Sequence, residues 1–136
     1  MSVQGQSFVT GDAAAGTDEI VMRIPGAEPA DGVMAHLINA DPERGLVASI
    51  IHLKPGAHIP AHVHESFAEA HYVLEGDLVN DDVELGPGAY ITHGPGVVHG
   101  PHSSKGGCRV LTVQTGHPGP EQSDHQLVNG GGGGQG

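Results

Sequence analysis

The chain is 136 residues long, which suits one domain with one continuous core rather than two. Its 5 basic and 16 acidic side chains give a formal net charge of -11. A field of that sign repels phosphate backbones and anionic lipids, so we expect no nucleic acid and no membrane as partner. The N-terminus carries neither a basic segment nor an apolar run, and we therefore expect a cytoplasmic protein.

Composition divides the chain into three parts. Residues 1–19 have a loose composition and are predicted to be a flexible segment or one edge strand. Residues 20–115 are predicted to form the single folded domain. Residues 116–136 are rich in Gly and end in GGGGQG, which buries too little apolar area to offset the entropy of ordering. This tail is therefore predicted to be disordered.

The domain consists of short β-like segments separated by turn signals. In chain order these segments are EIVMRIP, VMAHLIN, GLVASIIHL, EAHYVLEG, DLVNDDVEL, AYITH, VVHG and RVLTVQT. Glycines and prolines lie between them, and no segment sustains helical periodicity. The pattern predicts an all-β sandwich or barrel. The lone cysteine, Cys108, lies in the last segment and is predicted to be a small apolar strand residue rather than a nucleophile.

Histidine is the one enriched residue type, and its clustering indicates a metal site. The chain has 11 histidines, and eight of them lie in one stretch, at positions 52, 58, 62, 64, 71, 93, 99 and 102. His62 and His64 are separated by one residue, so on a strand both imidazoles leave the same face and can meet one ion. Glu69 follows after a gap long enough for a turn, so the next strand can bring its carboxylate past the same face.

A mixed nitrogen and oxygen ligand set suits Fe, Mn, Ni, Cu or Zn rather than Ca or Mg. Any one of these residues alone would be read as an ordinary surface or core residue. The joint spacing is what favours a metal site: a Gly, five residues, HxH, four residues, a Glu, six residues and a Gly, which runs from Gly56 to Gly76.

This segment resembles the first conserved motif of the cupin superfamily, and residues 88–99 are similar to its second motif. The second match departs at Gly94, where the family has Pro, and at Ser103, where it has Asn. The resemblance implies a small jelly-roll β-barrel with the ion inside one mouth, and frequent dimerisation, so a homodimer is expected. It also implies that His99 completes a metal site with His62, His64 and Glu69, which would hold one divalent Zn, Fe, Mn or Ni ion.

The predicted function depends most on the role of His71. This residue stands two residues after Glu69 on the same predicted strand, so it should face the interior beside the ion, as a further ligand, as a general acid/base or as a hydrogen-bonded interior histidine. His58, His93 and His102 are predicted to be rim, turn or supporting residues rather than ligands. His52 could reach the cavity, Phe67 could line its mouth, and Tyr72 should point outward.

Three functions remain open, all on a small-molecule substrate or ligand. The favoured one is non-redox cyclase, isomerase or lyase chemistry on a carbonyl, enol or phenolic compound, with the metal as Lewis acid and His71 moving a proton. The first alternative is an Fe(II)-dependent dioxygenase, since three imidazoles and one carboxylate leave two positions of an octahedral ion open. The second is a metal-binding or ligand-binding domain without catalysis.

Overall fold

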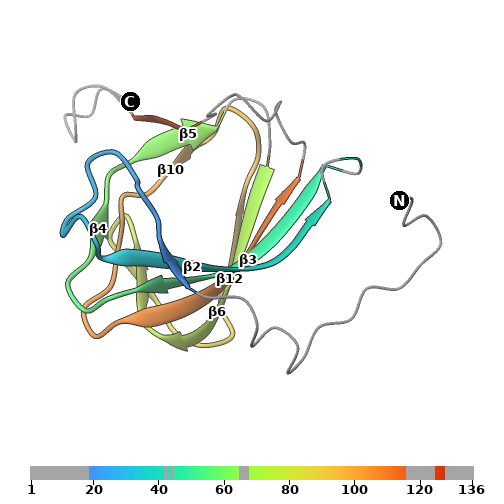
Figure 1. The fold of residues 1–136 in the computed structure, drawn as a ribbon. Coiled ribbons are helices and arrows are strands. Elements are labelled where there is room, and N and C mark those ends of the chain that lie inside the picture. The colour runs from blue at the N-terminus through green and yellow to red at the C-terminus, as the bar shows by residue number, and fades with distance from the viewer. Residues whose placement is uncertain (1–18, 42, 44, 65–67, 116–124, 128–136) are drawn as a thin grey trace.

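The computed structural model describes residues 19–41, 43, 45–64, 68–115 and 125–127 (Figure 1). This part of the chain contains strands and turns and no helix, so the all-β prediction is confirmed. It follows that no described helix is long and apolar enough to span a membrane. The predicted domain limits stay predictions, since most residues outside 20–115 lie beyond the described ranges.

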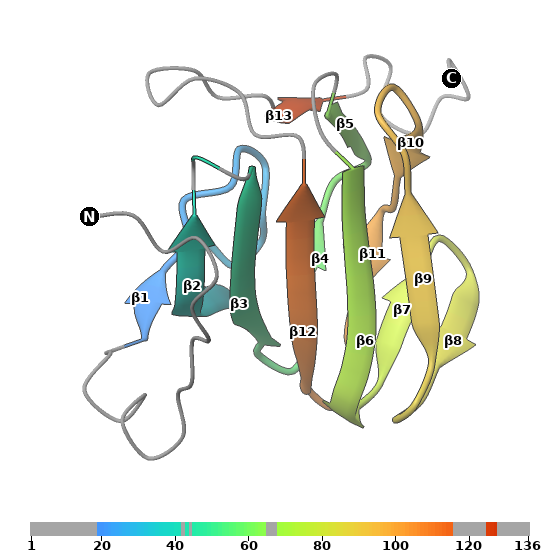
Figure 2. The ribbon, with the colours of Figure 1, turned by 90° about the vertical axis from the view of Figure 1, so that its right-hand side faces the viewer.

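The largest layer is a sheet of six antiparallel strands, which Figure 2 shows side by side. Each strand pairs antiparallel with its neighbour. Because strands are pleated, alternate side chains of every strand point to one side of the sheet. In spatial order the strands are β1 (Ile20–Val21), β2 (Val33–Asp41), β3 (Leu46–Leu53), β12 (Cys108–Thr115), β6 (Ala68–Gly76) and β9 (Tyr90–His93).

Two smaller sheets lie opposite this layer (Figures 1 and 2). One consists of β10 (Val98–His99), β5 (His62–His64) and β13 (His125–Leu127), and the other of β4 (His58–Ile59), β11 (His102–Ser103), β7 (Leu78–Asn80) and β8 (Val83–Leu85). Among the described residues, strand pairing leaves three separate sheets, so the expected barrel is not closed. Pro60 separates β4 from β5 and Pro101 separates β10 from β11, and proline cannot donate the ladder hydrogen bond that would continue a strand.

Two segments differ from their sequence predictions. The segment DLVNDDVEL folds as a hairpin of β7 and β8, with Asp81 at a φ of 60° in the two-residue turn, a conformation that Asp tolerates better than most residues. Residues 125–127, inside the tail predicted to be disordered, pair with β5, whose backbone would otherwise be open on that side.

The space between the layers is divided between apolar and polar side chains. The core is built from small and branched residues, as the scarcity of aromatics requires: Val33, Leu53, Ala57, Ile59, Val73, Leu78, Cys108 and Val110. Cys108 is 3% exposed on β12, which confirms its prediction as a buried strand residue. The largest fully buried side chain, however, is His99. The interior therefore holds polar groups where a larger apolar core would otherwise continue.

Candidate metal centre

Four potential ligands from three strands converge between the layers. One ligand atom from each of His62, His64, Glu69 and His99 lies within 4.8 Å of those of the others. The four residues are 5%, 5%, 8% and 0% exposed. Buried polar groups in such numbers require partners, because leaving them without hydrogen bonds or a metal costs free energy.

Strand geometry explains how each potential ligand reaches the cluster. His62 and His64 leave the same face of β5 because side chains alternate along a strand. β10 pairs with β5 in the register that places His99 opposite His62, so the third imidazole arrives as a cross-strand neighbour. Glu69 comes from β6 in the opposite layer. The site therefore joins the two layers of the fold.

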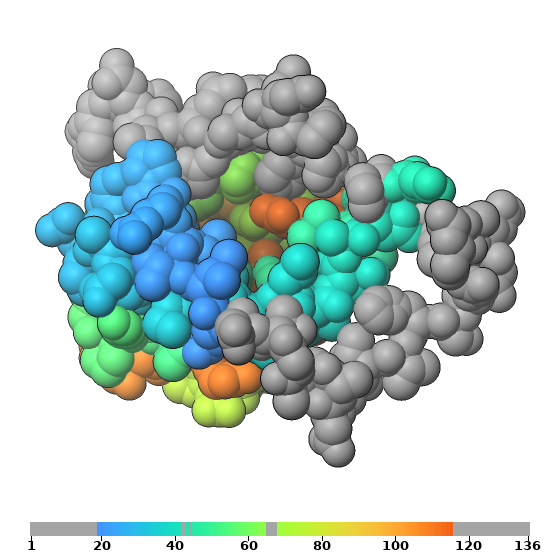
Figure 3. All heavy atoms as spheres, in the orientation of Figure 1, coloured from blue at the N-terminus to red at the C-terminus, as the bar shows by residue number. Residues whose placement is uncertain are grey.

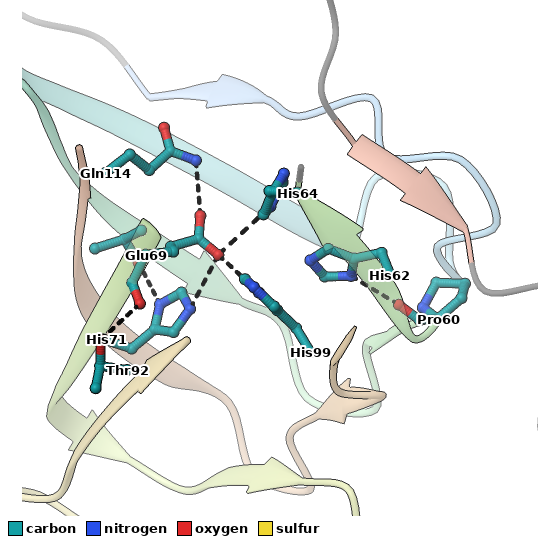
Figure 4. Close-up of polar contacts among 9 residues, drawn as sticks. Pro60, His62, His64, Glu69, His71, Thr92, His99 and Gln114 are labelled. Atoms are coloured by element: carbon teal, nitrogen blue, oxygen red, sulfur yellow. Dashed lines mark hydrogen bonds and ion pairs between the residues drawn. The ribbon is translucent and has the colours of Figure 1, made fainter. Parts of the chain in front are cut away.

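The Glu69 carboxylate is at the centre of this cluster (Figure 4). Its Oε1 lies 3.1 Å from His99 Nδ1 and 3.6 Å from His64 Nε2, while its Oε2 accepts a hydrogen bond of 2.7 Å from Gln114 Nε2. Burial raises the pKa of the Glu69 carboxyl, but its interactions with the neighbouring imidazoles lower it by more, so the pKa lies below its usual value. Glu69 is therefore anionic, which suits a potential ligand of a divalent cation.

The hydrogen bonds of the imidazoles fit a metal centre. His62 Nδ1 lies 2.9 Å from the carbonyl oxygen of Pro60, which can only accept, so Nδ1 carries the proton and Nε2 has the lone pair that a metal needs. His99 is fully buried, yet neither of its ring nitrogens has hydrogen-bond geometry to any described group, even though Nδ1 stands close to Glu69. A cation among these groups would account for both observations.

His71 lies beside the four-residue cluster. Its Nε2 is 3.3 Å from Glu69 Oε1, and its Nδ1 shares a hydrogen bond of 2.9 Å with Thr112 Oγ1. Thr112 is its cross-strand neighbour on β12, as Gln114 is that of Glu69. The Thr112 bond fixes the orientation of the ring. Figure 4 shows the other side of the His71 ring directed toward Glu69.

His93 and His102 both lie beside the same cluster. The His93 ring stacks on His99, with centroids 4.1 Å apart, and burial together with the charges of neighbouring histidines lowers its pKa to about 4. His102 is 5% exposed on the cavity wall, and its ring nitrogen lies within 4.8 Å of those of His71 and His99. Burial, more than the neighbouring imidazoles, holds the pKa of His102 well below its usual value, so this ring is neutral. His102 thus lies on a wall of the cavity, beside the cluster.

The cluster opens into a cavity of about 140 Å³ between the layers. Figure 3 shows a hollow on this face, between the blue and turquoise parts of the chain, with green and orange atoms at its base. Apolar residues from β3, β4 and the segment after β1 form the remaining walls, and the full lining is Met22, Ile24, Ser49, Ile51, Ile59, His62, His64, Glu69, His71, His102, Thr112 and Gln114. A small molecule in this cavity would touch both the cluster and His71.

The other residues singled out in the sequence lie away from the cluster. His52 points to the opposite face from Ile51 and lies 3.7 Å from Glu19. His58 is exposed on β4, and Tyr72 is 42% exposed on the outward face of β6, as predicted. Phe67 falls outside the described residues.

Sequence reasoning missed Thr112, Gln114 and the place of His102 in the cavity. The first two left a signal. Alternation from Cys108 and Val110 puts Thr112 and Gln114 on the inward face of a strand. Burying a polar side chain there costs free energy unless it has a hydrogen-bond partner.

A model of the ChrR cupin-like domain matches residues 20–118. The chain belongs to this cupin family. The match includes all four potential ligands and His71, so the resemblance drawn from the two motifs is confirmed at the level of the family. No curated protein matches the chain in sequence.

Solved structures share the fold at low sequence identity. The polyketide cyclase RemF from Streptomyces resistomycificus is 24% identical, with a TM-score of 0.70 over 89% of this chain and 86% of that one. An acetylacetone dioxygenase from Acinetobacter johnsonii is 13% identical, with a TM-score of 0.63 over 82% and 74%. A predicted oxalate decarboxylase from Thermotoga maritima is 18% identical, with a TM-score of 0.60 over 73% and 90%. These likenesses establish the cupin fold.

Proposed function

We propose that this chain is a metal-dependent cupin enzyme, of jelly-roll form and homodimeric, that acts on a small carbonyl, enol or phenolic compound without a redox change. His62, His64, Glu69 and His99 hold one divalent Zn, Fe, Mn or Ni ion, and His71 moves a proton in a cyclase, isomerase or lyase reaction. The observation that carries the proposal is the position of His71. Its Nε2 lies 3.3 Å from Glu69 Oε1, while its Nδ1 shares a hydrogen bond with Thr112.

Each group has a distinct part in this chemistry. A bound divalent ion supplies Lewis acidity, which polarises a carbonyl or enol oxygen and makes a neighbouring proton more acidic. The imidazole of His71 can take that proton or return it at another atom, because a neutral imidazole has one nitrogen that accepts a proton and one that donates. The apolar side chains in the cavity walls make the surroundings less polar than water, which strengthens electrostatic interactions inside.

Relatives with the same fold support both this function and its nearest alternative. RemF is a polyketide cyclase, which favours the non-redox reading. The Acinetobacter protein is an acetylacetone dioxygenase, and three imidazoles with one carboxylate would also leave an Fe(II) ion two positions for substrate and dioxygen. We place the non-redox reaction first because of the additional imidazoles of His71 and His102 in the cavity. Binding without catalysis is the third possibility.

The decisive experiment combines metal analysis with an oxygen assay. Protein purified without added metal is analysed for its elements, stripped, and reloaded separately with Zn and with Fe(II) under nitrogen. Each form is then assayed on a panel of β-diketones, enols and phenols by product analysis and by oxygen consumption. We expect turnover by the zinc form without oxygen uptake. Turnover by the Fe(II) form alone, with stoichiometric oxygen uptake, would make the protein a dioxygenase instead.

His71→Ala tests the assignment of the proton-moving group. We expect the variant to keep its metal and to lose roughly 10²- to 10⁴-fold in turnover, the usual contribution of a general acid/base. His58→Ala is the matched control, since His58 is exposed on β4. Complete loss of metal from His71→Ala would instead make His71 a ligand.

A further inference from the structure

The cavity has a second, deeper compartment that the metal centre does not explain. It has a volume of about 40 Å³ and reaches between Leu53, Leu78 and Val110 of the core. Its other walls, Ile51, Ile59, His71, His102 and Thr112, are also walls of the larger cavity. The two spaces therefore adjoin, and the shared residues surround the passage between them.

The deeper compartment is apolar, except at this passage. Aliphatic side chains form its floor, and the polar atoms near it belong to His71, His102 and Thr112. Thr112 and Nδ1 of His71 satisfy each other through their hydrogen bond, and Nε2 of His71 faces Glu69 Oε1 at 3.3 Å. The compartment thus suits a hydrocarbon group, and a polar group would find partners only at the passage.

Both ring nitrogens of His102 have unused hydrogen-bonding capacity at this passage. The residue is 5% exposed, and neither ring nitrogen has a hydrogen-bond partner among the described residues. An imidazole buried in this way loses its bonds to water and gains none in return. The centroid of its ring lies 5.7 Å from that of His71 and 5.6 Å from that of His62. His102 therefore stands between the candidate metal site and the compartment.

The volumes limit what can be enclosed. Each water-sized group needs about 10–15 Å³ of cavity volume. The deeper compartment therefore takes about three heavy atoms and the larger one on the order of ten. A ligand enclosed in both would thus be a single ring or a short chain. A fused polycyclic skeleton would have to extend outside.

We propose that the deeper compartment is a subsite for a short apolar tail of a small oxygen chelator. The chelating oxygens lie at the cluster of His62, His64, Glu69 and His99, a polar group in the middle of the ligand bonds to His102, and an alkyl end of about three carbons enters between Leu78 and Val110. The substrate class is then a short acyl or alkyl enol or dicarbonyl compound. This inference rests on the proposed metal centre and adds the selection of ligand size and shape.

The test measures binding, so it needs no knowledge of the reaction. Zinc-loaded protein is titrated by calorimetry with acetohydroxamate, butyrohydroxamate, hexanohydroxamate and octanohydroxamate, which share one chelating group and differ in tail length. We expect affinity to rise roughly fourfold for each methylene that becomes buried, and then to stop rising when the compartment is full. Equal affinity along the whole series, on protein with its zinc bound, would overturn the subsite alone. Protein that binds neither zinc nor any hydroxamate would overturn the metal centre as well.

Variants of Val110 give opposite expected shifts. Val110 is 2% exposed on the inward face of β12, at the wall of the compartment. Val110→Ile should shorten the tail length at which affinity stops rising, and Val110→Ala should lengthen it. Leu111→Ala, one residue further on the outward face, is the control and should leave the length profile unchanged. Thermal unfolding checks that each variant is folded, and the conservative Val110→Ile keeps the test valid if the alanine variant is not.

His102→Phe tests the polar group at the passage. Phenylalanine keeps a flat aromatic ring of similar size but has neither nitrogen, so 3-hydroxybutyrohydroxamate should lose about tenfold in affinity while butyrohydroxamate changes little. His102→Gln restores a donor and an acceptor and should recover part of the loss. Equal losses for both ligands would show that His102 supports the cavity without bonding to its occupant, and would overturn its role in the proposal.

Discussion

Strands β6 and β12 present different chemistry on their two faces. The inward face carries Glu69 and His71 on β6, opposite Gln114 and Thr112 on β12. The outward face carries Tyr72, which is opposite Leu111 and 42% exposed. His71 and Tyr72 are adjacent in the chain, so consecutive residues face the cavity and the outside of the sheet.

This comparison shows that the candidate site depends on register more than on composition. Side chains alternate with a period of two, so a slip of one residue between β6 and β12 would turn Thr112 and Gln114 outward and bring Leu111 into the cavity. The buried residues Val73, Cys108 and Val110 resist such a slip, because it would expose them. The apolar end of the sheet thereby holds the polar end in place.

The largest expected difference between the two faces is in metal binding. His64→Ala removes one of the four proposed ligands, so we expect the bound metal to fall from one ion per chain to nearly none after dialysis. Elemental analysis of dialysed protein measures it. Val63→Ala, on the opposite face of the same strand, should retain the ion. Equal retention by both variants would contradict the ligand assignment.

Gln114→Leu should have the next largest effect. The amide of Gln114 donates to Glu69 Oε2 over 2.7 Å and leaves Oε1 directed at the imidazoles. Loss of such a supporting bond typically costs 10- to 100-fold in metal affinity, and competition with a chelating dye can measure it. Val113→Ala, the outward neighbour, should bind metal as the unchanged protein does. An unchanged affinity in Gln114→Leu would show that Glu69 needs no support.

Thr112→Val should affect His71 and spare the metal. The variant keeps the shape of the side chain but removes the oxygen that lies 2.9 Å from His71 Nδ1. We expect full metal content, about tenfold lower turnover, and a changed tautomer population of His71 in nitrogen NMR spectra. Thr115→Val, at the exposed end of the same strand, is the control. An unchanged His71 spectrum would contradict the positioning role of Thr112.

The double variant Tyr72→Ser with Tyr90→Ser should have the smallest effect. These two residues are opposite each other on the outward face and are 42% and 62% exposed. We expect unchanged metal content and a stability loss below about 1 kcal/mol, as is usual for exposed positions. Elemental analysis measures the metal content and thermal unfolding measures the stability. Separately, sedimentation equilibrium of the unchanged protein tests the expected homodimer. Loss of the ion here would break the separation of the faces.

Local sequence was sufficient for part of the candidate site. The alternation of a strand places His62 and His64 together, and it also places Glu69 and His71 together, whatever the rest of the fold does. The scarcity of aromatic residues already required a core of small and branched side chains. Turn signals correctly divided most strands. They did not reveal the β7–β8 hairpin, because its turn is Asp81-Asp82 without a glycine.

Contacts between distant strands were decided only by the tertiary structure. Gln114 and Thr112 meet Glu69 and His71 across 45 and 41 residues of sequence, and the pairing register that unites them depends on packing along the whole sheet. The same holds for His102, which the sequence predicts to be a rim, turn or supporting residue. The pairing of β11 with β4 and β7 turns its side chain inward. The sequence by itself thus determined the family and a cluster of metal-binding residue types. Only the packing of two layers decided which further side chains enclose that cluster, because burial and cross-strand register arise from contacts that local spacing does not encode.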